Sequence, residues 1–166
     1  MTASGLATLA AAGVRVGKVQ VSSALKVADP GDPASREALA RFHEPRYLHQ
    51  VRWQEPDGAV RGTDDLDEAL ANGPLGTEWR VHFHVPIQAA TLDAPGLATT
   101  RDAIDGLLAT LAARPDASPH LEVETYTWSV LPPRLRPATP EALTAGLGTE
   151  LGWLEERMER LGLLSP

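Results

Sequence analysis

Two patterns in this chain place groups that could carry chemistry two residues apart. One holds His82 and His84 within an alternation of polar and apolar residues. The other holds Glu122 and Glu124 in a similar alternation. If both segments are β-strands, each pair lies on one face of its strand, because successive side chains point to opposite faces. Neutral imidazole and carboxylate are ligands for Mn²⁺, Zn²⁺, Mg²⁺ or Fe²⁺, so the sequence predicts a divalent-metal half-site of His82, His84 and Glu124.

Each of these side chains also has a purely structural explanation. His82 and His84 could be buried histidines that are hydrogen-bonded to their neighbours. Either Glu122 or Glu124 could form a buried salt bridge with Arg80, since buried charges are normally paired. The metal hypothesis and the salt-bridge alternative are both open on the sequence alone.

Further polar groups are expected around the same site. Glu122, Glu124 and Lys26 are the candidate catalytic groups, because they could ligate a metal or move a proton. The candidate substrate-binding side chains lie in or near the predicted strands: Gln20, Ser22, Arg46, His49, Tyr126 and Trp128. For Arg46 and His49, a position on the surface is an equal alternative.

Capping and turn signals divide the chain into alternating elements. Asp32 followed by Pro33 is typical of a helix start, and Gly13 is typical of a helix end. The predicted helices cover 1–12, 33–43, 65–72, 99–114 and 140–164. The predicted strands cover 14–23, 46–53, 78–87 and 120–128, with 59–61 as the return of a hairpin.

The order of these elements predicts an α/β fold with parallel β-α-β units and right-handed crossovers. Parallel strands covered by helices are normally near-continuous apolar runs, whereas these strands carry polar rows. One explanation is an antiparallel sheet with one face in water. The other is a curved parallel sheet with its polar rows inside a (β/α) barrel, where chemistry lies at the C-terminal ends of the strands. We favour the barrel, because a hairpin meander would not need long helical connections.

Composition and charge exclude several classes of protein. The 166 residues with a net charge of −7 suit a single domain spanning 1–166. An acidic balance without a basic block argues against nucleic acid as a partner. Cysteine is absent, which removes disulfides and thiolate ligands. No apolar run approaches the ~20 residues of a membrane span and no basic segment opens the chain, so we expect a cytoplasmic location without direct membrane insertion.

Four segments, in order along the chain, resemble the EboE family of metabolite-traffic proteins of the Ebo gene clusters. They are Gly17–Lys26, Glu44–Val51, Trp79–Pro86 and His120–Trp128. The resemblance implies the C-terminal part of a xylose-isomerase-like TIM barrel, akin to sugar-phosphate isomerases and epimerases. It matches Glu124 to the carboxylate of the final barrel strand, and either His84 or Gln20 to the histidine position. The N-terminal strands of such a barrel have no counterpart here.

A full barrel typically needs ~250 residues, so 166 residues predict a partial (half) barrel with outer helices. An open half-barrel would expose strand edges, so we expect a homo-oligomer or a separate N-terminal half to complete it. One predicted function is metal-assisted isomerisation or epimerisation of a sugar-like polyol or its phosphate. The alternatives are a non-catalytic carrier of a small-molecule metabolite for a membrane export system, and a pseudoenzyme scaffold with internal salt bridges.

Overall fold

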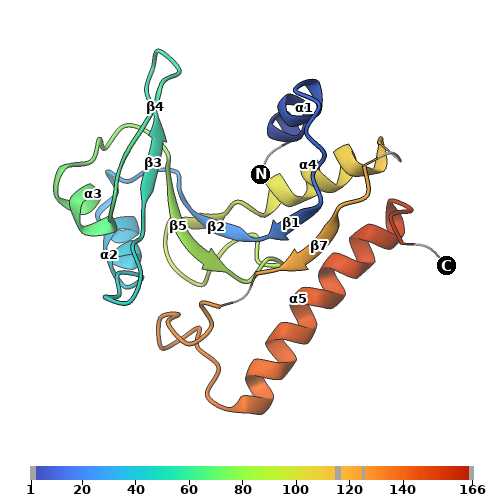
Figure 1. The fold of residues 1–166 in the computed structure, drawn as a ribbon. Helices are drawn as coiled ribbons and strands as arrows, with labels where there is room; N and C mark the ends of the chain where they lie inside the picture. Colours follow the sequence, from blue (N-terminus) through green and yellow to red (C-terminus); the bar gives the residue numbers. More distant parts are fainter. Residues whose placement is uncertain (1–2, 115–116, 125, 165–166) are drawn as a thin grey trace.

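The computed structural model describes residues 3–114, 117–124 and 126–164 (Figure 1). Its helices are α1 (Ala3–Ala11), α2 (Pro33–Ala40), α3 (Leu66–Asn72), α4 (Arg101–Ala112) and α5 (Pro140–Arg160). Its strands are β1 (Lys18–Val21), β2 (Ser23–Val27), β3 (Val51–Gln54), β4 (Val60–Thr63), β5 (Trp79–Val85), β6 (Leu97–Thr99) and β7 (His120–Val123). Among these residues, no helix combines the length and apolar character needed to cross a membrane.

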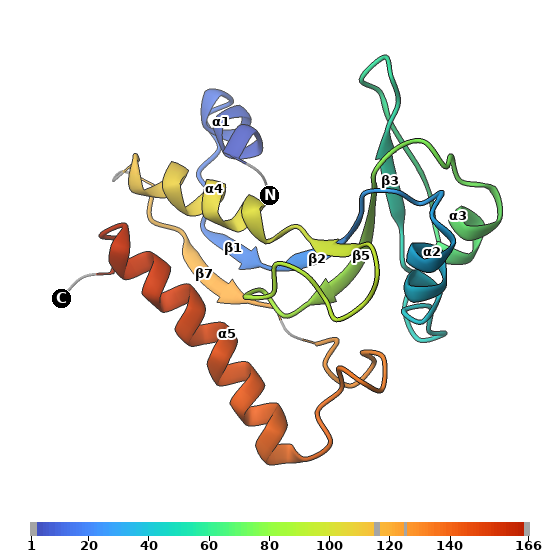
Figure 2. The same ribbon diagram turned by 180° about the vertical axis from the view of Figure 1, so that it is seen from behind.

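The larger sheet is antiparallel, with the strand order β4-β3-β5-β2-β6. Its β3–β4 hairpin projects away from the other strands (Figures 1 and 2). The pairing of β2 with β5 changes register, since Ala24 pairs with His84 but Leu25 pairs with Val81. Two residues of β5, His82 and Phe83, therefore have no partner on β2. Such a bulge can redirect a side chain, and this one includes a candidate functional histidine.

The smaller sheet is a parallel pair, in which β1 lies beside β7. Only Ser22 separates β1 from β2, so one extended segment belongs to both sheets. Along this segment β7 runs parallel to β1 and β5 runs antiparallel to β2, so the carboxyl ends of β7 and β5 meet opposite Ser22 (Figure 1). This meeting of strand ends brings His84 and Glu124 together.

The predicted half-barrel of parallel strands is wrong, because the main sheet is antiparallel and does not curve into a barrel. The polar row is explained by an antiparallel sheet with one face in water, on which Arg52, Arg80 and His82 are exposed. The incomplete barrel was the reason to expect a homo-oligomer or a separate N-terminal half. That reason no longer applies, and self-association stays a prediction.

Two clusters of buried apolar side chains stabilise the fold. The first lies between the antiparallel sheet and helices α2 and α3, and it includes the fully buried Trp79. The second joins the parallel sheet to α1, α4 and α5, and it includes the fully buried Leu108. Because burial of apolar surface is the main favourable contribution to folding, each sheet is held by its own set of helices.

The helix boundaries follow the capping signals. The Asp32 carboxylate accepts a hydrogen bond from the Ser35 N–H at 2.8 Å, and Pro33 is the first residue of α2. Gly13 follows α1 with φ of +72°, a conformation that glycine adopts more readily than other residues. Thr139 caps α5 by accepting from the Ala142 N–H at 3.2 Å. The sequence-based predictions of these three boundaries are confirmed.

The strand boundaries agree less well with the sequence-based predictions than the helix boundaries do. The strand expected over 46–53 begins only at Val51, because the Glu44 carboxylate accepts hydrogen bonds from the N–H groups of Arg46 and Tyr47 at 2.9 and 3.0 Å. These bonds turn the chain just where the strand was expected to start. The strand expected over 120–128 ends at Val123, and the three-residue β6 is too short to show a period in the sequence.

Candidate functional site

A cavity of about 220 Å³ lies between the β1–β2 segment, β5 and the first turns of α4. Four of the predicted site residues line it: Gln20 and Ser22 on the β1–β2 segment, and His82 and His84 on β5. Arg80 also lines the cavity, and α4 adds apolar side chains. The cavity therefore combines a polar side, from two strands, with an apolar side from the helix.

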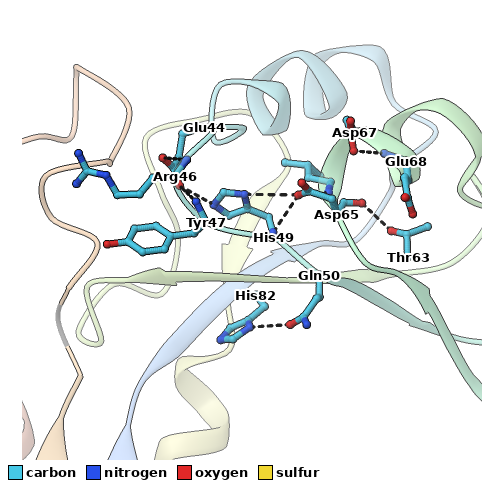
Figure 3. Close-up of polar contacts among 11 residues, drawn as sticks. Glu44, Arg46, Tyr47, His49, Gln50, Thr63, Asp65, Asp67, Glu68 and His82 are labelled. Atoms are coloured by element: carbon cyan, nitrogen blue, oxygen red, sulfur yellow. Dashed lines mark hydrogen bonds and ion pairs between the residues drawn. The ribbon is translucent and has the colours of Figure 1, made fainter.

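The two histidines contact each other through their ring nitrogens. The Nε2 atoms of His82 and His84 are 3.1 Å apart, so one of them carries the shared hydrogen. The ring centroids are 5.1 Å apart. On its other edge, His82 places Nδ1 3.0 Å from Oε1 of Gln50, which precedes β3 (Figure 3). The exposed ring of His82 is thus oriented from both edges.

His84 is buried, with only 5% of its surface exposed. Its Nδ1 atom lies 3.7 Å from Oε2 of Glu124, and the ring of Tyr126 packs against it at a centroid distance of 4.8 Å. Burial lowers the pKa of His84, the Glu124 carboxylate partly offsets this, and His82 lowers it further. The burial of Tyr126 and the charge of Glu124 both raise the pKa of the Tyr126 phenol. A neutral imidazole beside a carboxylate can accept or pass on a proton.

As far as the structure describes the chain, the lining of the cavity carries basic and neutral polar groups and no carboxylate. Arg80 forms an ion pair with Glu78 at 3.3 Å but stays 63% exposed, so its guanidinium remains accessible. Glu124 lies against the buried edge of His84 and is not part of the lining. Among the described lining residues, Arg80 is the one that carries a fixed positive charge, so a small anion would meet an accessible guanidinium here.

The arrangement gives no three-ligand set for the predicted divalent metal. Glu124 contacts Nδ1 of His84, whereas His82 contacts Nε2, and these atoms lie on opposite edges of one ring. Within residues 3–114, 117–124 and 126–164, no group of three or more His, Cys, Asp or Glu side chains is placed to hold an ion. The metal stays a prediction that these side-chain positions do not support.

The remaining predicted catalytic residues lie outside the cavity lining. The Glu122 carboxylate accepts a hydrogen bond from Lys18 at 2.8 Å, and both side chains are about half exposed. This bond and the charge of Lys18 lower the pKa of Glu122. Lys26 lies 3.7 Å from Glu78. Both contacts are surface ion pairs, which contribute little to stability.

His49 is enclosed between two carboxylates, an arrangement that we call the His49 clasp: Glu44, His49 and Asp65 (Figure 3). Nε2 of His49 is 3.4 Å from Glu44, and Nδ1 is 3.7 Å from Asp65. The backbone N–H of His49 also donates to Asp65 at 2.9 Å. The ring is 2% exposed and stacks on Phe83. Arg46, in contrast, is exposed and lies outside the cavity lining.

The pKa directions in the clasp follow from its burial. Burial lowers the pKa of His49, and the charges of Glu44 and Asp65 only partly oppose this. Burial by itself raises the pKa of Asp65, but hydrogen bonds from the His49 and Leu66 N–H groups bring it below its usual value. The clasp therefore fastens the start of β3 to the N-terminus of α3.

Trp128 has a structural contact that the sequence does not reveal. Its Nε1–H donates to Glu150 of α5 at 2.9 Å, and the same carboxylate accepts from the Ile87 N–H at 3.0 Å. A Cβ atom at Gly146 would lie 2.7 Å from the Trp128 ring, so the helix approaches this ring closely. Burial raises the pKa of Glu150, and its two hydrogen bonds oppose this. Glu150 thus fastens α5 to the end of β5.

Several contributing residues are missed by the sequence reasoning: Gln50, Glu44, Asp65 as a partner of His49, and Glu150. One of them has a signal in the sequence, since Glu150 lies four residues before Leu154, on the buried side of α5. The partners of His49 and His82 depend on contacts between distant segments, and no local pattern shows them.

A larger groove of about 630 Å³ lies over β3 and the start of β5 and shares Arg80 with the cavity. Its charged lining is mixed, with Arg52 and Arg80 against Glu55 and Glu78. It contains neither histidine nor a buried polar group, so the smaller cavity is the better candidate site.

Comparison of the chain with protein-family models, with curated proteins and with solved structures gave no match.

Proposed function

We propose that this protein binds a small anionic metabolite in the cavity beside His82 and His84, as a carrier in metabolite traffic. The proposal rests on one cavity that no carboxylate among the described residues lines. Its polar lining includes Gln20, Ser22, Arg80 and the two histidines. The resemblance to the EboE family is the reason for placing this binding in metabolite traffic.

The size of the cavity limits the ligand. Its volume of about 220 Å³ corresponds to about seven water molecules at ~30 Å³ each. Small-molecule sites more often measure ~300–1,000 Å³. A phosphate or carboxylate group on a short polyol fits this space better than a nucleotide does. Arg80 supplies a guanidinium for the anionic group, and Gln20 and Ser22 supply hydrogen-bonding partners for hydroxyl groups.

The test is a titration of the isotope-labelled full chain with inorganic phosphate and with a triose phosphate, followed by NMR. We expect shifts concentrated at the cavity residues, and binding weakened about tenfold or more in Arg80→Gln, because a charged hydrogen-bond partner is lost. The matched control is Arg52→Gln, which removes an arginine of the same exposed row outside the cavity lining. Absence of binding, or equal weakening by both variants, contradicts the proposal.

Acid–base catalysis of the isomerase or epimerase type is the second candidate, and the 3.7 Å approach of His84 to Glu124 favours it. A carboxylate against one edge of a neutral imidazole can orient the ring, and a proton at its other edge would pass to or from His82, whose Nε2 lies 3.1 Å away. Incubation of the chain with sugar phosphates in deuterated water tests this candidate. Incorporation of deuterium at the carbon next to the carbonyl would support catalysis if this incorporation is lost in His84→Gln. If no deuterium is incorporated, catalysis is contradicted and the carrier function stands.

Titration with Mn²⁺ and Zn²⁺ tests whether a metal takes part. Micromolar binding that is lost in His84→Ala and in Glu124→Ala would support a metal-assisted site. No binding would support the carrier, in agreement with the separation of the two ligands on opposite edges of the His84 ring.

A further inference from the structure

Two residues beyond β7, Tyr126 and Thr127, contact His84. The Tyr126 ring packs on the His84 ring at 4.8 Å between centroids, tilted by 52°. One residue further, the Thr127 hydroxyl donates to the backbone carbonyl of His84 at 2.7 Å. His84 lines the cavity, so the position of its ring depends on what packs behind it.

Tyr126 is in turn supported by Tyr47, from a distant part of the chain. The two rings are 5.3 Å apart in an edge-to-face arrangement of 72°. Such pairs contribute about 0.5–1.5 kcal/mol beyond the area that they bury. Tyr47 is 38% exposed and Tyr126 is 45% exposed, so neither ring is fixed by enclosure in the core. Their mutual contact is therefore a main restraint on Tyr126.

The backbone of Tyr47 is fixed by the His49 clasp. The Glu44 carboxylate accepts hydrogen bonds from the Arg46 and Tyr47 N–H groups and also lies 3.4 Å from Nε2 of His49 (Figure 3). His49 is anchored on Asp65 through its backbone N–H at 2.9 Å. A continuous series of contacts thus leads from the N-terminus of α3 to the back of the His84 ring.

We infer that Tyr47 and Tyr126 are positioning residues for His84, and that the Glu44 turn sets the tyrosine pair so that the His84 ring is presented to the cavity at a fixed angle. The inference rests on the proposed binding of an anion in this cavity. It predicts that changes at Tyr47, which does not line the cavity, alter both the signal of the His84 ring and the affinity for the anion.

The experiment compares Tyr47→Ala and Tyr47→Phe by NMR of the histidine rings and by titration with inorganic phosphate. Tyr47→Ala removes the edge-to-face contact. We expect it to shift the His84 ring signals and to weaken phosphate binding about two- to tenfold, the equivalent of one aromatic pair. Tyr47→Phe keeps the aromatic ring and should restore both the ring signals and the affinity. A Glu44→Gln variant has one side-chain oxygen and can accept only one of the two backbone hydrogen bonds. Its ring signals and its affinity for phosphate should lie between those of Tyr47→Ala and Tyr47→Phe.

The control is Leu48→Ala, a truncation of the neighbouring residue, which is 65% exposed. It should change neither the ring signals nor the affinity. If phosphate binds and Tyr47→Ala leaves both the His84 signals and the affinity unchanged, the positioning role is wrong while the proposed function stands. If phosphate does not bind the unaltered chain, the proposed function fails, and the role assigned to the tyrosine pair fails with it.

Discussion

Two histidine environments lie on opposite sides of β5 and differ in what encloses them. His49 is 2% exposed and lies between the carboxylates of Glu44 and Asp65, with its ring stacked on Phe83. The pair of His82 and His84 contacts one carboxylate at its buried edge and otherwise opens on a cavity with an accessible arginine.

This difference separates a structural histidine from a binding one. In the His49 clasp both ring nitrogens face protein carboxylates, so no edge of the ring is left for a ligand. In the pair the ring nitrogens contact Gln50, Glu124 and each other, but both rings also line a cavity. A histidine that lines no cavity is expected to affect folding, and a histidine that lines one is expected to affect binding.

The largest expected effect is on stability, from His49→Ala. The substitution leaves a cavity in the core where the ring stacked on Phe83, so we expect the free energy of unfolding to fall by about 3 kcal/mol. The two carboxylates keep their backbone hydrogen bonds. Urea denaturation measures this value. A loss below about 1 kcal/mol, an ordinary value for a point mutation, would remove the distinction between the two environments.

A smaller loss is expected from Asp65→Ala. Asp65 caps α3 through the Leu66 N–H at 2.8 Å and also accepts from the His49 N–H. Loss of an N-cap costs about 1–2 kcal/mol, and the same denaturation experiment measures it. Asp64→Ala is the matched control, since its side chain is 88% exposed and it should be nearly neutral. Equal losses of stability in Asp64→Ala and Asp65→Ala would show that the His49 clasp does not contribute to stability.

The dependence of stability on pH should report the burial of His49 and His84. Burial lowers the folded-state pKa of His49 and of His84 below the usual value of 6.5. Below that value the unfolded chain therefore binds more protons than the folded chain, and stability falls as the pH is lowered from about 6.5. For His49, the nearby Glu44 and Asp65 oppose this effect, while His43 and His82 add to it.

Variants assign this pH dependence to residues. His49→Gln and His84→Gln should each flatten the fall in stability below about pH 6.5, because glutamine does not titrate. Chemical denaturation at a series of pH values checks this, and a curve that stays steep in both buried-site variants would show that other groups dominate.

The smallest effect on stability is expected at His82. Because its ring is exposed, His82→Gln should change the free energy of unfolding by no more than about 0.5 kcal/mol. The same variant should weaken phosphate binding, since it removes a group that lines the cavity. Denaturation and titration of one sample measure both quantities, and a large loss of stability with unchanged binding would reverse the roles of the two environments.

Local signals predict the helices, because caps act within a few residues. Asp32 with Pro33, and Gly13 after α1, need no distant partner to act as they do. The direction of strand pairing has no such local signal. The polar alternation around His82 is equally compatible with a parallel barrel and with an antiparallel sheet that has one wet face, and the structure has the second.

The candidate site was predicted in part, through a fold that turned out to be wrong. His84 and Glu124 do come together, but because β5 and β7 end at the same point of one strand and not because parallel strands share an edge. The sequence leaves His49 either at the mouth of a barrel or on the surface, whereas its side chain is buried in the His49 clasp. Its partners, Glu44 and Asp65, are brought to it by a turn and a helix start whose meeting depends on the tertiary fold.

The segment that runs through β1 and β2 has a consequence for the order of folding. β2 finds its partners within the first two thirds of the chain, whereas Lys18 of β1 pairs with Glu122, 104 positions further on. Closing so long a loop costs more chain entropy, and contacts between distant positions slow folding. During synthesis β1 would therefore lack this partner until β7 has left the ribosome, and Glu124, Tyr126 and Thr127, which contact His84, would follow the residues that line the cavity.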